Sequence, residues 1–123
     1  MSKILVVEDE QTLLKMIQIT FEVAGYEVLT ALNGKEAIEK LGETPDLILL
    51  DILMPGEDGI ETLKKIKQRN DSREIPVIIL TNFNDPEKRN AAKSAGAIDY
   101  LVKSDQDVDQ ILEKVKSLLL GGA

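Results

Sequence analysis

The chain has no cysteine and no histidine, and aromatic residues make up only 3% of its 123 residues. Without cysteine there is no disulfide framework, no thiolate nucleophile and no sulfur ligand for a metal. Without histidine there is no imidazole to act as general base, metal ligand or phosphoryl carrier. Any phosphohistidine in the chemistry of this protein must therefore belong to a partner. The length and composition suit one globular domain.

No hydrophobic run approaches the roughly 18 residues that span a bilayer. The first apolar run, 4–7, is also too short for an export signal. We therefore expect a cytoplasmic protein without membrane association. With 15 basic and 22 acidic residues the net charge is −7, which argues against direct nucleic-acid binding because phosphates select clustered lysine and arginine.

Five short apolar runs alternate with segments of helical spacing. The apolar runs are 4–7, 28–31, 47–50, 77–80 and 98–102. The helical segments are 13–24, 37–41, 60–66, 86–95 and 108–119. Continuous apolar runs are typical of strands buried on both faces, so the alternation predicts an α/β fold, a doubly wound five-stranded parallel sheet with helices on both faces. We expect one domain over residues 1–120 and a flexible tail at 121–123.

The helix at 86–95 is predicted to be the least firmly packed of the five. Asp85 suits its N-cap and Pro86 its first position. Its apolar face consists of Ala91, Ala92 and Ala95 alone, which offers little surface for burial.

Ligands of an open parallel sheet bind at the carboxyl ends of its strands. The polar residues that follow or end the predicted strands are Glu8, Asp9, Asp51, Thr81 and Lys103. Taken singly, the acids also suit a helix N-cap, and the threonine and the lysine suit an ordinary strand end. Their coincidence at strand ends of one sheet favours a shared site.

A carboxylate such as Asp51, placed between apolar runs, is costly unless something offsets its burial. Three neighbouring acids would raise at least one pKa unless a cation joined them. Oxygen ligands without histidine or cysteine favour Mg²⁺, for which Mn²⁺ can substitute. Lys103 suits a carboxylate or phosphate oxygen, and Thr81 can donate to a phosphoryl oxygen. The set predicts a phosphoryl-transfer site with Asp51 as nucleophile.

The motifs resemble the receiver domain of two-component response regulators over essentially the whole chain. The matching stretches are Val7-Glu8-Asp9, the segment DILMPGEDG at 51–59, Thr81, and Tyr100 to Lys103. All four stand in the family's order and at its separations. The resemblance implies a flavodoxin-like (βα)5 fold with strand order 2-1-3-4-5.

The resemblance implies that Asp51 accepts a phosphoryl group from a sensor histidine kinase or a histidine phosphotransfer protein. It also implies that Asp9, Asp51 and the main-chain carbonyl of Leu53 bind Mg²⁺, with Glu8 acting largely through water. Lys103 would contact the phosphoryl group. The protein would be a signalling module that catalyses only its own phosphorylation and dephosphorylation, and not otherwise an enzyme.

For the response, the resemblance implies that Thr81 swings toward the phosphoryl group and Tyr100 turns inward. New phosphoryl acceptors favour one loop arrangement over another. The readout surface would be the fourth helix, the fifth strand and the fifth helix, acting on a downstream protein or an output domain. We expect a monomer or a weak phosphorylation-dependent dimer.

The chain departs from the family pattern after its strand-five lysine, where Ser104 stands in place of the usual proline. Because a cis bond to serine costs about 2.5–4 kcal/mol, we expect a trans bond there.

Asn82 replaces a residue that is commonly small in the family. Leu53 and Phe83 occupy positions that tune phosphoryl loss in the family, and neither can orient a water, so we predict a phosphoryl state lasting at least many minutes.

Several alternatives remain open from the sequence. The chain is either a receiver detached from an output domain, or a complete protein that docks to another or acts as a phosphoryl relay or sink. A Mg²⁺-dependent phosphohydrolase would want an acid at the position of Leu53. An FMN-binding electron carrier would want a hydroxyl-rich first loop and more aromatic residues, whereas the first loop here is acidic.

Overall fold

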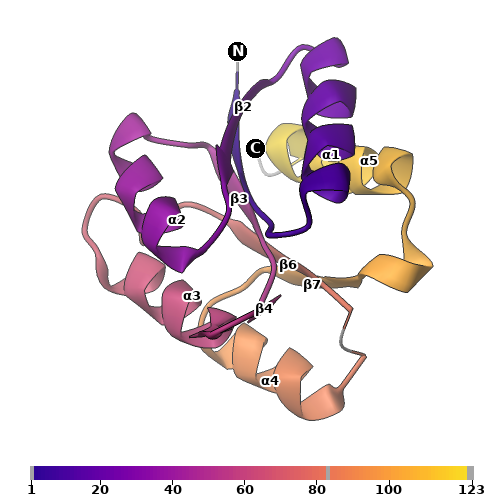
Figure 1. Ribbon diagram of the computed structural model, residues 1–123. Helices are drawn as coiled ribbons and strands as arrows, with labels where there is room; N and C mark the ends of the chain where they lie inside the picture. The colour runs from indigo at the N-terminus through magenta and orange to yellow at the C-terminus, as the bar shows by residue number, and fades with distance from the viewer. Residues whose placement is uncertain (1, 83, 122–123) are drawn as a thin grey trace.

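A computed structural model describes residues 2–82 and 84–121. Its centre is a five-stranded sheet in the order β2-β1-β3-β6-β7, with all neighbours parallel (Figure 1). These strands are β1 (Lys3–Val7), β2 (Glu27–Ala31), β3 (Leu47–Leu50), β6 (Val77–Thr81) and β7 (Asp99–Val102). Counted along the chain, they have the predicted order 2-1-3-4-5, and the predicted fold class is confirmed.

Helices cover both faces of this sheet. The helices are α1 (Gln11–Val23), α2 (Gly34–Lys40), α3 (Gly59–Gln68), α4 (Pro86–Ser94) and α5 (Val108–Gly121). Helices α1 and α5 pack on one face, while α2, α3 and α4 pack on the other (Figure 1). No helix within residues 2–82 and 84–121 is long and apolar enough to cross a membrane.

Two apolar clusters, one on each face, explain why the strands read as continuous apolar runs. In β1, Leu5 and Val7 join the cluster under α2, α3 and α4, and Ile4 and Val6 join the one under α1 and α5. All four side chains are at most 1% exposed. Successive residues of a strand point to opposite faces, so a sheet covered on both sides buries every position.

A small antiparallel hairpin, β4 (Leu53–Met54) with β5 (Glu57–Asp58), follows β3 and was not predicted. Strands of two residues are too short to show an alternating pattern. The turn between them has Pro55 and Gly56 at its centre, and Gly56 has a φ of +74°, as the third position of a type II turn requires. The hairpin lies directly between Asp51 and α3.

Short 3₁₀ helices follow α2 and β7, at η1 (Leu41–Glu43) and η2 (Lys103–Asp105). The bond between Lys103 and Ser104 is trans, as expected from the missing proline. Helix α5 ends at Gly121, the first residue of the segment expected to form a tail. Residues 122 and 123 of that segment, and Phe83, lie outside the described residues.

Helix α4 is much less buried than its neighbour α3. In α4 only Ala92 is buried, whereas α3 buries five residues. The expectation that 86–95 is thinly packed agrees with this difference. The Asp85 side chain caps α4 by accepting a hydrogen bond from the Glu87 backbone N–H at 2.9 Å.

Candidate functional site

The pairing of β1 with β3 brings two acids together at the edge of the sheet. Val7 lies opposite Leu50 in the parallel register, so the residues that follow, Glu8 and Asp51, leave the sheet side by side. The Asp51 backbone N–H donates to the Val7 carbonyl at 3.0 Å and extends this pairing by one residue. The two carboxylates therefore lie together at the carboxyl ends of neighbouring parallel strands, where ligands of such sheets bind.

Carboxylate oxygens of Glu8, Asp9 and Asp51 lie within 4.8 Å of one another. Glu8 and Asp51 are buried, with 1% and 3% of their surface exposed, while Asp9 is exposed. This is the acidic cluster expected from the sequence. Three carboxylates this close need a positive charge nearby.

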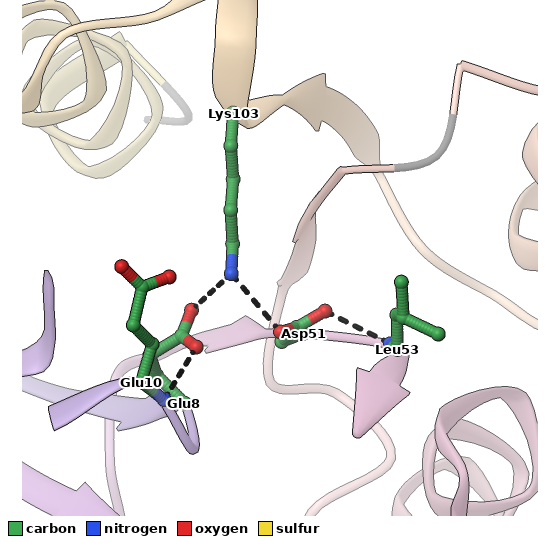
Figure 2. A network of polar contacts seen from close by, with 5 residues as sticks. All are labelled: Glu8, Glu10, Asp51, Leu53 and Lys103. Carbon is green, nitrogen blue, oxygen red and sulfur yellow. Dashed lines mark hydrogen bonds and ion pairs between the residues drawn. The ribbon is translucent and has the colours of Figure 1, made fainter. Parts of the chain in front are cut away.

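Part of that charge comes from Lys103, which begins η2 directly after β7 and reaches between two of the acids (Figure 2). Its Nζ lies 2.6 Å from Oε1 of Glu8 and 3.1 Å from Oδ2 of Asp51. Burial lowers the pKa of Lys103, but the hydrogen bond with Glu8 and the charges of both acids outweigh it, so the net pKa is raised. Lys103 therefore stays charged.

The cation does not fully satisfy Glu8. Burial raises the pKa of Glu8 above its usual value of 4.5, with a further rise from the Asp51 charge, although hydrogen bonds to Lys103 and the Glu10 backbone oppose the shift. Oε2 of Glu8 accepts from the Glu10 backbone N–H at 2.9 Å. Oε1 makes an ion pair with the Lys103 ammonium at 2.6 Å and no other polar contact in the described part of the chain. A carboxylate oxygen accepts more than one partner, so a water or a cation can also bind there.

These donors fit a hard divalent cation. They are all oxygens and they converge on one cavity of about 680 Å³. The cavity is lined by Glu8, Asp9, Glu10, Asp51, Leu53, Met54, Pro55, Gly56, Asn82 and Lys103. Oε1 of Glu8, whose one polar contact among the described residues is with Lys103, gives such an ion, or its bound water, a partner.

The hairpin that follows β3 places Leu53 at the same cavity. Its backbone N–H donates to Oδ1 of Asp51 at 2.9 Å (Figure 2), which orients that carboxylate while Lys103 holds the other oxygen. The Leu53 side chain is 44% exposed. Asn82, which lines the same cavity, is also exposed.

Thr81 and Tyr100, the two expected switch residues, are both buried. Thr81 ends β6 and has no exposed surface, and Tyr100 in β7 is 3% exposed. The strands β6 and β7 are paired, with Thr81 opposite Val102 and Tyr100 opposite Ile79, and β7 is the edge strand on which α4 packs. Neither side chain lines the cavity that contains Asp51.

Strand-end reasoning missed the contacts that come from elsewhere. The Leu53 and Glu10 backbone N–H groups orient the acids. They are main-chain groups, so the residue types at these positions do not indicate the contacts. The guanidinium of Arg89 in α4 lies 4.8 Å from the Tyr100 ring centre. Arg89 lies within α4, so this contact with Tyr100 is evident only from the placement of α4 against β7.

Comparisons with known proteins agree with this geometry. Residues 4–116 match the response regulator receiver domain. The chain is 38% identical over 120 residues to the response regulator ArlR of Staphylococcus saprophyticus, covering 97% of this chain and 53% of that protein. It thus spans about half the length of the curated relatives it matches.

Solved structures show the same fold. The chemotaxis protein CheY4 of Vibrio cholerae has a TM-score of 0.88 and 33% identity, covering 94% of this chain and 97% of that one. The Mn²⁺-bound form of the response regulator Rcp1 has a TM-score of 0.83 and 29% identity, covering 98% and 95%. The protein belongs to the family of response regulator receiver domains, the signalling modules of two-component systems.

Proposed function

We propose that this receiver accepts a phosphoryl group on Asp51 from a phosphohistidine of a partner kinase or phosphotransfer protein. The observation that supports this most strongly is the environment of Asp51. Its carboxylate is buried at the wall of a cavity, with one oxygen on the Lys103 ammonium and the other on the Leu53 N–H. A nucleophile oriented in this way beside a fixed cation suits attack on phosphorus.

In the proposed reaction an Asp51 oxygen forms a bond to phosphorus while the bond between phosphorus and the partner's imidazole nitrogen breaks. Lys103 would pair with a phosphoryl oxygen, because its flexible side chain lets the ammonium group move from the Asp51 carboxylate to the new negative charge. Thr81, whose side chain does not line the cavity before the reaction, would swing toward the phosphoryl group, and its hydroxyl would donate a hydrogen bond to another phosphoryl oxygen. The chain has no histidine that could replace the partner's.

We further propose that Asp9, Asp51 and the Leu53 carbonyl hold Mg²⁺, or Mn²⁺ in its place, with Glu8 acting through water. The bound ion supplies positive charge that neutralises phosphoryl oxygens. The acidic cluster of Glu8, Asp9 and Asp51, which the single Lys103 ammonium only partly neutralises, supports this assignment. The Mn²⁺-bound form of Rcp1 adds a precedent within the fold.

Incubation with Mg²⁺ and acetyl phosphate, followed by intact mass measurement, tests the proposed phosphorylation. The wild-type protein should gain one phosphoryl group, and Asp51→Asn should gain none at that position. Asp109→Asn, which changes an exposed acid of α5, is the matched control and should behave as wild type. An unmodified wild type, or an Asp51→Asn protein that is modified equally, would overturn the proposal.

We propose a phosphoryl state that lasts at least many minutes at room temperature. Leu53 lies at the rim of the cavity, and an apolar side chain there cannot orient an attacking water. Asn82 also lines the cavity and would narrow access to Asp51. Phe83, outside the described residues, has the same expected shielding role as Leu53. Leu53→Asn should shorten the half-life, measured by the loss of phosphoprotein over time. A wild-type half-life of seconds would contradict this.

Residues 1–120 would act as one phosphoacceptor unit whose α4, β7 and α5 face controls a downstream protein or an output domain. The curated relatives are about twice as long as this chain, which supports the output-domain form of the proposal. Catalysis would be limited to the protein's own phosphorylation and dephosphorylation. Size measurement with and without acetyl phosphate would test the expected monomer or weak phosphorylation-dependent dimer.

A further inference from the structure

Tyr100 is buried beneath α4. Only 3% of its surface is exposed, and its ring belongs to the apolar cluster on the face of the sheet that α2, α3 and α4 cover. Helix α4 packs directly on β7, which carries Tyr100. Helix α4 therefore covers the Tyr100 ring, although Ala92 is the only buried residue of that helix.

Arg89 supplies part of that cover. Its guanidinium carbon lies 4.8 Å from the centre of the Tyr100 ring, within the ~6 Å over which a cation is attracted to an aromatic face. Arg89 is half-buried in α4. In the described part of the chain its guanidinium makes no ion pair with a carboxylate, so its charge faces the ring without competition from a salt bridge.

The charges around the phenol agree with this arrangement. Burial raises the pKa of the Tyr100 phenol, the positive charge of Arg89 opposes the rise, and Asp85 and Asp51 add to it. Arg89 is thus the cation that acts on this ring from α4. The stem of Arg89 adds apolar contact to a helix face that otherwise has little.

We propose that Arg89 is a positioning residue that holds Tyr100 in its buried position by stacking its guanidinium on the ring. The contact is made by the chain's own side chains and does not depend on Asp51 chemistry. The buried arrangement expected after phosphorylation is therefore partly formed in the unmodified protein. A cation–π contact of the strength found at exposed sites favours the buried position by about 2- to 5-fold.

A link to signalling follows, and it rests on the proposed function. If Asp51 reacts with a phosphodonor in the arrangement that has Tyr100 inward, the rate of phosphorylation follows the population of that arrangement, and a contact that favours it also favours phosphorylation. Loss of the Arg89 cation should then slow the phosphorylation of Asp51 by acetyl phosphate by up to the same factor of about 2 to 5.

Nitration of tyrosine by tetranitromethane tests the positioning role. The chain has two tyrosines and no cysteine, so a Tyr26→Phe background leaves Tyr100 as the only tyrosine and has no thiol to react. Without Mg²⁺ or phosphodonor, Arg89→Ala should raise the nitration rate of Tyr100 by about 2- to 5-fold. Loss of the nearby cation by itself would disfavour the reactive phenolate, so a faster rate reports greater exposure.

The matched control is Lys93→Ala, which removes an exposed positive charge from the same helix and should leave the rate unchanged. Arg89→Lys keeps a cation and should react more slowly than Arg89→Gln, a comparison that decides the question if Arg89→Ala does not fold. An Arg89→Ala rate equal to the parent, an equal increase in Lys93→Ala, or equal rates for the lysine and glutamine variants would each overturn the proposal.

The same variants separate this proposal from the proposed function. Nitration is measured without phosphorylation, so a failure of Asp51 to accept a phosphoryl group leaves the nitration result valid. If nitration of Arg89→Ala accelerates while its Asp51 phosphorylation rate stays at the wild-type value, the contact stands and its link to the switch is overturned.

Discussion

The two loops that border the cavity are held in different ways. The loop after β3 forms a hairpin around Pro55 and Gly56, and Glu57 accepts a hydrogen bond from the Gly34 backbone N–H at 2.8 Å. At the end of the hairpin the Asp58 side chain accepts from the Ile60 N–H at 3.0 Å and caps α3. This segment, residues 53–58, carries the Leu53 carbonyl and is held by contacts from several directions. It is called the fixed loop below.

The loop after β6 leads into a helix with few attachments. Asn82 is exposed, and α4 buries only Ala92. Its attachment to β7 includes the Arg89 contact with Tyr100. A helix with so little buried apolar surface can shift at a small cost in free energy.

The difference matches two tasks of the proposed phosphorylation switch. The proposed metal ligands must hold their geometry, which the loop after β3 provides for the Leu53 carbonyl. A response to a new charge requires an element with two arrangements of similar free energy, and the small buried surface of α4 suits that task.

The largest expected effect contrasts the packing of the two helices. Leu63 of α3 has no exposed surface, so Leu63→Ala should lower the free energy of unfolding by about 2–5 kcal/mol. Ala92→Gly in α4 should cost only about 1 kcal/mol, mainly through helix propensity. Urea unfolding measures both. Equal losses would mean that α4 is attached as firmly as α3.

A second prediction concerns whether the backbone at the end of the fixed loop can shift to accommodate a larger residue. A Cβ at Gly59 would overlap the backbone Cα of Ile52, which a side-chain rotation cannot relieve. Gly59→Ala should therefore cost about 1–3 kcal/mol. Gly42→Ala is the control, since a Cβ there meets nothing within 4 Å, and its unfolding free energy should stay near that of wild type. A neutral Gly59→Ala would show that the hairpin can relax.

The N-caps of α3 and α4 provide a matched pair. Asp58→Ala and Asp85→Ala each remove one capping bond, and each should cost about 1 kcal/mol. Only Asp58→Ala should also weaken Mg²⁺ binding in a calorimetric titration, because Asp58 ends the hairpin that carries Leu53. Equal Mg²⁺ affinities of the two variants would contradict a positioning role for the fixed loop.

The parallel sheet was predictable from the alternation of apolar runs and helical segments, and the acidic cluster because strand ends of a parallel sheet converge wherever their residues lie in the sequence. The strand order came from the resemblance to receiver domains and not from the pattern of residues. The hairpin was not predictable, since Leu53–Met54 and Glu57–Asp58 are too short to show a period, although Pro55 and Gly56 were recognisable as turn residues. The double contact of Lys103 with Glu8 and Asp51, and the stacking of Arg89, depend on side-chain reach and helix placement, which spacing alone does not specify.

The smallest expected effect concerns the ionisation of the Glu8 carboxyl group. The folded-state pKa of Glu8 is raised above 4.5, chiefly by burial. The folded state therefore binds the Glu8 proton more tightly than the unfolded state, and stability from this group is lost as pH rises from 4.5 through the raised pKa. Glu8→Gln does not titrate, so its stability relative to wild type should increase over that window and then level off.

Denaturant unfolding of both proteins across this pH range, without divalent ions, measures the difference. The effect should be small because Lys103 offsets much of the burial penalty through its ion pair with Glu8. A stability difference that stays constant with pH would mean that the Glu8 carboxylate is no worse solvated when folded than when unfolded. The acidic cluster would then need no further cation at Glu8, and Asp9, Asp51 and the fixed loop would have to account for metal binding by themselves.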